Sequence, residues 1–379
     1  MSSLNQFSER ERKAYGLIKK IPKFIRNPII SNVNKLRVRR VKNLQTPQNL
    51  IFYVTDYCNA KCSHCFYWKN LNKRQDEMSL EQIKIMIKSL KTPLNMLVIT
   101  GGEPFIRKDL YEICSAFYQI NKTKRINIVT NGLLDTRITD TVRKLLTENT
   151  DKRLTIIVSL DGLEETHNKI RRVPNIWNKD INLIKELKKI EETNSNLSLF
   201  VNLTMTKTNI NEVKALSKYV KEELKINFKA NVLRTGKNYY QVPKDILMDY
   251  EPEISNQPSV EELEGIYDWL KEESKDLPHK VEALKLKHSI DMIKYEKPTL
   301  KCLAGLNDGV VFPTGKVAVC EPTKAFGDLK DYNFDFCKLW NSKEAQIRKM
   351  QTSKCFCLQS CNLLNSMKYD TNTLKNLFN

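Results

Sequence analysis

Three cysteines within eight residues constrain this chain more than any other feature of its sequence. Cys58, Cys62 and Cys65 have the spacing C-x3-C-x2-C, and they directly follow residues 50–56, which read as a buried strand. An odd number of cysteines on one tight loop cannot all pair locally, and iron–sulfur clusters are held by cysteine thiolates. Three ligands would leave one iron of a four-iron cluster open to an outside ligand. A zinc site or three incidental cysteines are the alternatives.

The composition is that of a soluble globular protein. The chain has 379 residues, 41% of them apolar, which suits one large domain or two ordinary ones. No apolar run approaches the length of a transmembrane helix, and the N-terminus lacks the pattern of a signal peptide. Ten cysteines in such a context favour a reducing compartment, and metal or redox chemistry over disulfides. We therefore expect a cytoplasmic protein.

Six predicted strands alternate with predicted helices. The strands cover residues 50–56, 95–100, 125–130, 154–160, 197–204 and 226–233. This alternation predicts an α/β fold with a parallel sheet and crossover helices. Periodicity alone does not choose between a doubly wound sheet and a barrel. In both folds the functional site lies at the carboxyl ends of the strands.

Glycine-containing motifs follow three of these strands. They are Gly101-Gly102-Glu103-Pro104, Thr130-Asn131-Gly132 and Ser159-Leu160-Asp161-Gly162. Glycines let a backbone approach a ligand closely, and the carbonyls and carboxylate of the first motif can accept hydrogen bonds from an ammonium group. We expect all three motifs to meet the cysteine loop at one rim of the sheet.

With these motifs the chain resembles the radical S-adenosylmethionine (SAM) enzymes. The resemblance implies a partial (β/α)6 TIM-like barrel. It implies a [4Fe–4S] cluster on Cys58, Cys62 and Cys65 that binds SAM at its open iron. The activity that it implies is reductive cleavage of SAM to a 5′-deoxyadenosyl radical, which takes a hydrogen atom from a substrate. Such chemistry needs an electron donor such as flavodoxin or ferredoxin.

The resemblance also implies which residues contact SAM. Gly101, Gly102, Glu103 and Pro104 would bind the amino group, Thr130 and Asn131 would lie beside the cofactor, and Ser159 would touch the ribose, with Asp161 in the same motif. His64 stands where the family often has an aromatic residue. Residues 167–172 resemble the stretch that ends in the arginine for the SAM carboxylate. Because Arg171 and Arg172 are adjacent, either one can be the match.

A second set of cysteines lies near the C-terminus. It consists of Cys302, Cys320, Cys355, Cys357 and Cys361, and a β-hairpin is predicted around Pro313-Thr314-Gly315. The set resembles the SPASM or twitch extension of radical SAM enzymes. This implies one auxiliary [4Fe–4S] cluster, held by Cys302, Cys320, Cys361 and one of Cys355 or Cys357. A structural zinc site is the alternative. Cys114 lies in an apolar helix and is expected in the core.

We divide the chain into four parts. Residues 1–46 are a basic amphipathic arm, residues 47–236 the barrel, residues 237–300 a linker with helices at 260–272 and 281–293, and residues 301–379 the auxiliary cluster domain. The arm holds twelve lysines and arginines against two glutamates, a net charge of +10 out of +19. It is expected either to bind an anionic membrane surface or to pack over the barrel. Pro22 and Pro28 are expected to interrupt its helix.

The substrate class is not determined by these motifs. It is either a small molecule, phosphorylated or lipid-linked, or a peptide. A zinc or nucleic-acid-binding protein that uses the basic arm is a third hypothesis, but we do not expect a nucleic-acid partner.

Overall fold

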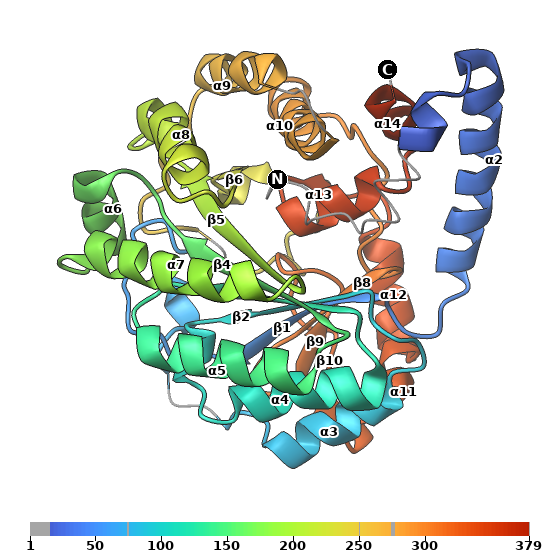
Figure 1. The fold of residues 1–379 in the computed structure, drawn as a ribbon. Helices are drawn as coiled ribbons and strands as arrows, with labels where there is room; N and C mark the ends of the chain where they lie inside the picture. The colour runs from blue at the N-terminus through green and yellow to red at the C-terminus, as the bar shows by residue number, and fades with distance from the viewer. Residues whose placement is uncertain (1–15, 74–75, 250, 274–276, 379) are drawn as a thin grey trace.

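The computed structural model describes residues 16–73, 76–249, 251–273 and 277–378. Within them, a nine-stranded sheet has the order β10-β9-β8-β1-β2-β3-β4-β5-β6. Strands β1 to β6 are adjacent in sequence order and all parallel. Figure 1 shows the helices of the first half of the chain layered along one face of this sheet. The predicted α/β fold, with a partial (β/α)6 barrel, is confirmed.

The strands agree with the predicted ranges to within one or two residues in the first half of the chain. The strands are β1 Asn49–Thr55, β2 Met96–Gly101, β3 Arg125–Thr130, β4 Arg153–Ser159, β5 Leu197–Met205, β6 Asn227–Val232, β7 Tyr239–Tyr240, β8 Asp308–Val311, β9 Lys316–Ala318, β10 Gly327–Asp328 and β11 Phe356–Cys357. The α-helices are α2 Lys23–Lys42, α3 Leu80–Ser89, α4 Leu110–Ala116, α5 Asp135–Glu148, α6 Glu164–Arg171, α7 Ile176–Thr193, α8 Val213–Glu222, α9 Val260–Glu272, α10 Leu277–Tyr295, α11 Phe336–Trp340, α12 Lys343–Gln351, α13 Ser360–Met367 and α14 Thr371–Leu377.

The main hydrophobic core lies between the sheet and these helices. Alternate residues of each strand enter it, for example Leu154, Ile156 and Val158 of β4. The helices contribute their apolar stripes, and α3 begins with a capping box at Ser79, as its sequence predicts. Cys114 is buried in this core, as expected. The opposite face of each strand points to the inside of the barrel.

The C-terminal hairpin does not stand apart from the barrel. Strands β8 and β9 form the predicted antiparallel hairpin, but β8 also pairs in parallel with β1 and so extends the main sheet. In addition, β7, in the predicted linker, pairs with β11, which contains Cys357. The helices predicted at 260–272 and 281–293 are α9 and α10, and Pro278 lies in the first turn of α10 rather than before it.

The N-terminal arm, where it is described, forms the long helix α2. The prediction that both prolines interrupt it is wrong for Pro28, which lies inside the helix, while Pro22 is its N-cap residue. Residues 1–15 of the predicted arm lie outside the described residues. None of the helices in the described part of the chain combines the length and apolar character needed to cross a bilayer.

A buried carboxyl group joins β8 to β1. Asn49 is the register partner of Asp308, and its side-chain amide donates a hydrogen bond of 2.9 Å to Asp308 Oδ1. Asn365 of α13 donates to the same oxygen at 2.7 Å. Burial raises the pKa of Asp308 from 3.8 to about 7. The amide donors are too weak to offset the loss of solvation.

We expect Asp308→Asn to flatten the pH dependence of stability between about pH 4 and 7. Because the pKa of Asp308 rises on folding, the folded state binds more protons than the unfolded state in this window. Its contribution to the free energy of unfolding therefore falls as pH rises, by at most about 1.4 kcal/mol per pH unit. Urea unfolding of both proteins at two pH values in the window measures the difference, and identical slopes would contradict it.

Candidate active site

The cysteine loop leaves β1 at the carboxyl edge of the sheet and is held by its own polar groups. The side chain of Asn72 accepts from Cys58 N at 2.9 Å and donates to Cys58 O at 3.0 Å. Ser63 N donates to the Ile170 carbonyl at the end of α6, at 2.9 Å. The three thiols are free, and burial raises the pKa of Cys58 to about 11 and that of Cys65 to about 12.

The two glycines after β2 pack directly against the backbone that leads into this loop. Gly102 N donates to Thr55 O at 2.8 Å, and a Cβ atom on Gly102 would lie 2.1 Å from Tyr57 O. A Cβ atom on Gly101 would lie 2.2 Å from Thr55 O. The close approach that glycine permits is therefore made to the cysteine loop itself, and it fixes the start of that loop.

Glu103 connects the rims of β2 and β3. Its buried carboxylate accepts from Thr130 Oγ1 at 2.8 Å, from Asn131 N at 2.7 Å and from Phe105 N at 3.2 Å. Burial nevertheless raises the pKa of Glu103 to about 7. The side-chain amide of Asn131 then reaches the cysteine loop, where it donates to Asn59 Oδ1 at 2.8 Å and lies 3.9 Å from Cys58 Sγ. Three predicted site residues thus meet next to the first cysteine.

Arg171 and Asp161 form a buried ion pair beside the second cysteine. Arg171 Nη2 lies 2.6 Å from Asp161 Oδ2, and Arg171 Nη1 lies 3.6 Å from Cys62 Sγ. Burial by itself would raise the pKa of Asp161, but Arg171, followed by His64, holds it below its usual value. His64 Nε2 is 3.5 Å from the same carboxylate, and burial lowers the pKa of His64, which favours a neutral imidazole.

The structure separates the two adjacent arginines. Arg172, in the left-handed conformation at φ 55°, points to the surface and forms two hydrogen bonds of 2.7 and 2.8 Å with Glu253. Arg171 alone lies among the cysteine-loop residues. Of the two, only Arg171 lies beside the cysteine loop, and its role as the SAM carboxylate ligand stays a prediction.

A buried pair that the motifs did not predict supports this ion pair. His167 Nδ1 accepts from Asp161 N at 3.0 Å, so the proton of the neutral ring lies on Nε2, 2.9 Å from Asp180 Oδ2. Burial lowers the pKa of His167 to about 3 and raises that of Asp180 to about 8. A Cβ atom on Gly132 would lie 1.9 Å from Asp180 Oδ1, which explains the glycine there. Nothing in the sequence singles out Asp180 as a site residue, because a carboxylate on an amphipathic helix such as α7 is ordinary.

The loop and its surroundings fit a cluster with a charged ligand. Three thiols share one loop, and two buried polar atoms beside them, His64 Nδ1 and Arg171 Nε, have no hydrogen-bond partner among the described residues. Ser159 ends β4 at this rim. Within the same residues, no three Cys, His, Asp or Glu side chains are arranged to hold a single metal ion. A cluster is bound differently, through cysteine thiolates on its several irons.

The C-terminal cysteines gather in a second place. The thiols of Cys302 and Cys355 are hydrogen-bonded to each other, and Cys320 and Cys357 interact electrostatically with Cys302. The strongest neighbours of Cys361 are instead Glu321 and Arg234. These interactions place both Cys355 and Cys357 in one group with Cys302 and Cys320. The ligand set remains a prediction.

A buried polar chain links the two cysteine sets. The guanidinium of Arg234, after β6, lies 4.2 Å from the ring of Phe66 and 3.2 Å from Glu321 Oε2. Glu321 follows Cys320 and accepts hydrogen bonds from Tyr53 at 2.5 Å and from Gln359. Phe66, next to Cys65, therefore contacts Arg234, and Glu321, next to Cys320, forms an ion pair with it. The two cysteine sites share one polar interior.

Comparison with known proteins agrees with this geometry. Residues 52–220 match the family model described as the Radical SAM superfamily. An AdoMet-dependent heme synthase from Methanosarcina barkeri is 25% identical over 327 residues, 80% of this chain and 85% of that protein. The Fe-coproporphyrin III synthase of the same organism is 30% identical over 176 residues, which are 46% of this chain and 41% of that protein.

The fold also matches a solved structure. Streptococcus suis SuiB, bound to the precursor peptide SuiA, aligns with a TM-score of 0.56 and 18% identity, over 88% of this chain and 74% of SuiB. Residues 52–220 of the chain therefore carry a radical SAM domain. The superfamily uses a [4Fe–4S] cluster and SAM, and these are the cofactors of this chain.

We expect Gly102→Ala to abolish cluster binding at the cysteine loop. The new methyl group would overlap Tyr57 O, so the backbone that precedes Cys58 has to move. After anaerobic reconstitution, iron analysis should show about four irons fewer per chain than in the wild type. Gly265→Ala is the matched control, because it adds a methyl group in open space on α9. Full iron content in Gly102→Ala would contradict this role of the glycine.

Proposed function

We propose that Cys58, Cys62 and Cys65 hold the [4Fe–4S] cluster that binds SAM, and that an auxiliary [4Fe–4S] cluster is held among the C-terminal cysteines. One observation carries the proposal. The cysteine loop, the Gly101-Gly102 segment, Asn131 and the Arg171–Asp161 pair, from four separate parts of the chain, contact one another at a single rim. Such convergence is expected of a cofactor site at the carboxyl ends of parallel strands.

When bound, the cluster and SAM supply a 5′-deoxyadenosyl radical that removes a hydrogen atom from the substrate. The residues of the chain position these groups. Arg171 offers its unpaired Nε to the SAM carboxylate while Asp161 holds its other side. The backbone of Gly101, Gly102 and Pro104, with Glu103, lies where the amino group would bind. Ser159, on the inner face of β4, would meet the ribose.

For the substrate we favour a small anionic molecule. The likeness to the heme synthase extends over 85% of that protein, whereas the likeness to SuiB concerns the fold. SuiB is described with a precursor peptide, so a peptide is the second substrate class. Incubation of the reduced enzyme with SAM and a deuterated compound of either class, followed by mass spectrometry for deuterium transfer from that compound into 5′-deoxyadenosine, distinguishes them.

An anaerobic preparation should be brown, contain about eight irons per chain and form 5′-deoxyadenosine from SAM under a reductant. The arginines test the site itself. We expect Arg171→Lys, which keeps the charge but loses the planar fork, to weaken SAM binding about tenfold or more, and Arg172→Lys to leave it unchanged. Equilibrium SAM binding, with iron content measured in parallel, decides the matter. Equal affinity in both variants would exclude Arg171 as the carboxylate ligand.

The chemistry requires electrons from an outside donor. We propose that this donor binds beside the auxiliary cysteines. A hollow of about 480 Å³ is lined by Cys302 and Cys355 together with Lys301 and Lys354. The lysines suit an acidic electron carrier such as flavodoxin or ferredoxin, because complementary charge speeds encounter.

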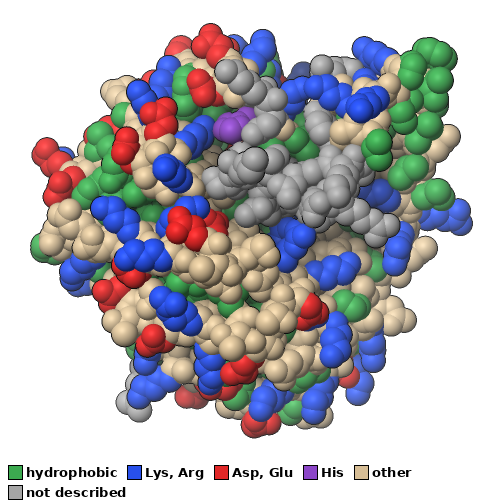
Figure 2. All heavy atoms as spheres, in the orientation of Figure 1, with side chains coloured by type: hydrophobic (Ala, Val, Ile, Leu, Met, Phe, Trp, Pro, Cys, Tyr) green, Lys and Arg blue, Asp and Glu red, His purple; other side chains and the backbone are tan. Residues whose placement is uncertain are grey.

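We also propose that α2 binds an anionic membrane surface. The helix does not have the burial pattern of a soluble amphipathic helix, since two of its four buried residues, Arg26 and Asn34, are polar while several of its apolar residues face solvent. Asn34 is buried and donates to Tyr369 O at 2.7 Å, whereas Phe24, Ile29 and Leu36 are 77%, 48% and 68% exposed. Figure 2 shows hydrophobic side chains gathered along α2, with basic side chains close by. Apolar contact combined with basic flanks is typical of peripheral membrane helices.

We expect the triple substitution F24S/I29S/L36S to lower binding to phosphatidylglycerol vesicles at least about tenfold without changing thermal stability. Each exposed side chain would lose roughly 1.5–3 kcal/mol of favourable burial in the bilayer interface. The variant I85S/I120S is the control, because it removes two exposed isoleucines from other surfaces. Co-sedimentation measures binding, and a loss that is equal in both variants would refute a specific role of α2.

A further inference from the structure

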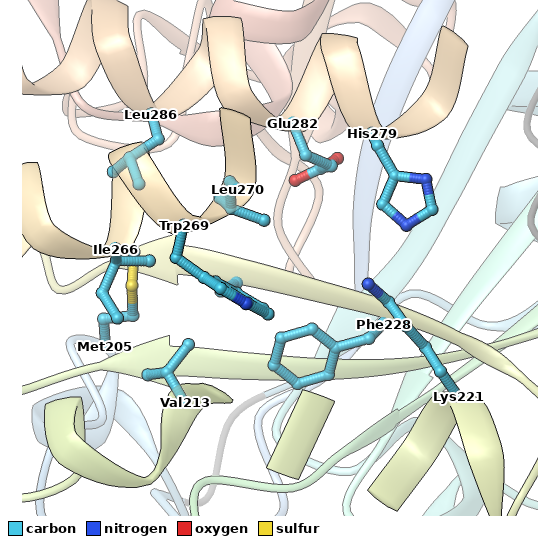
Figure 3. Close-up of a pocket in the computed structure, with 11 residues that line it drawn as sticks. Met205, Val213, Lys221, Phe228, Ile266, Trp269, Leu270, His279, Glu282 and Leu286 are labelled. Carbon is cyan, nitrogen blue, oxygen red and sulfur yellow. The ribbon is translucent and has the colours of Figure 1, made fainter. Parts of the chain in front are cut away.

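The inner face of the barrel becomes polar at β5 and β6. Side chains alternate along a strand, so Phe228 and Ala230, which pack toward the outer helices, place Lys229 on the opposite face. Figure 3 shows the outer side of β6, where Phe228 and Trp269 border a cavity of about 20 Å³. That cavity has room for about one water molecule. The outer side of β6 therefore has no room for a ligand of substrate size, and the polar groups of the opposite face, with Lys229, are considered next.

Lys229 stands level with the predicted SAM site. In the sheet, Ser159 is the register partner of Asn202, and Asn202 is the register partner of Lys229. All three alternate with residues of the outer core, so they line one row on the inner face. Neighbouring strands are about 4.8 Å apart, which puts the Cα atom of Lys229 about 10 Å from that of Ser159. A substrate group held at Lys229 would therefore leave the rest of that substrate within reach of the ribose site at Ser159.

Among the described residues, no anionic group forms an ion pair or a hydrogen bond with the ammonium group of Lys229, and Glu282 and Cys361 act on it only through electrostatic attraction. Its Nζ lies 4.0 Å from the ring centroid of Phe200, and no ion pair or hydrogen bond to it is found in the described part of the chain. The nearby carboxylate of Glu282 is hydrogen-bonded by Lys285, which also donates to Asn231 Oδ1 at 2.9 Å. Burial lowers the pKa of Lys229 to about 8.

The side-chain amide of Asn202, the register partner of Lys229, is neutral and keeps an unused N–H donor among the described residues. Asn202 Oδ1 accepts from Asn231 Nδ2 at 2.6 Å, and no hydrogen bond from Asn202 Nδ2 is found among the described residues. The row therefore presents one positive charge and one N–H donor side by side. A partly buried charge without a partner lowers stability, so its presence is explained when a ligand supplies the opposite charge.

We propose that Lys229 and Asn202 form a subsite for an anionic group of the substrate, a carboxylate or a phosphate. The proposal rests on the proposed function, since it is the SAM site at Ser159 that makes this row part of the active site. The SAM carboxylate itself is not the ligand, because Arg171 lies beside the cysteine loop to receive it. The subsite thus selects the substrate class and sets its orientation toward the radical.

The test is thermal unfolding of the anaerobically reconstituted enzyme and of Lys229→Met, which keeps the length of the side chain without its charge. Three probes are compared with sodium chloride at equal ionic strength: pyrophosphate, tricarballylate and iron coproporphyrin III. We expect at least one probe to raise the Tm of the wild type by about 3 °C and to have no such effect on Lys229→Met. Pyrophosphate alone would identify a phosphate, and the other two a carboxylate.

Lys218→Met, on the exposed surface of α8, is the matched control and should respond like the wild type. Without probes, Lys229→Met should be at least as stable as the wild type, because it removes an uncompensated charge. Equal responses of the wild type and Lys229→Met to every probe, including no response in either, would overturn the subsite. SAM cleavage by the wild type is assayed separately, so failure of the proposed function is distinguishable from failure of the subsite.

Discussion

The contact on which the site depends is the buried guanidinium of Arg171, held between the Asp161 carboxylate and the sulfur of Cys62. Burying a guanidinium is costly unless its charge and its donors are met, so each of these groups needs the other two. Asp161 follows β4, Arg171 ends α6, and Cys62 lies on the loop after β1. This ion pair therefore links the end of β4 and the end of α6 to a loop that lies about a hundred residues earlier in the chain, and it places the loop that would carry the cluster.

Much of this arrangement could be predicted from the sequence, because its signals are local. Strand ends and glycine motifs occupy short stretches, and parallel strands bring their carboxyl ends to one edge regardless of details. The sequence could not predict which residues each motif contacts. Gly102 was expected to approach a ligand, yet it packs against the carbonyl oxygen of Tyr57. Position 132 requires glycine because the side chain of Asp180, on α7, lies against it. Such requirements exist only once the chain is folded.

The same limit explains the errors outside the site. Pro28 was expected to break its helix, but the loss of one hydrogen bond is tolerated where Asn34 and Arg37 hold α2 against Tyr369. The division into a barrel and an auxiliary cluster domain at residues 301–379 stays a prediction, but the pairing of its strand β8 with the edge of β1 was not foreseen. In both cases a tertiary contact is involved, and neither contact leaves a pattern in the sequence.

The two faces of the sheet have different roles: the outer face packs the main hydrophobic core, and the inner face carries the site. The outer face carries the larger, aliphatic core, and the hydrophobic burial there contributes most to the stability of the fold. The inner face has a smaller apolar cluster centred on β1 and β8, where Tyr53 and Phe312 pack together, and carries more polar side chains toward β6. Because the fold does not need those inner positions, they are free to hold groups that destabilise it, such as Lys229. A charge in such a position is better explained by a ligand than by folding.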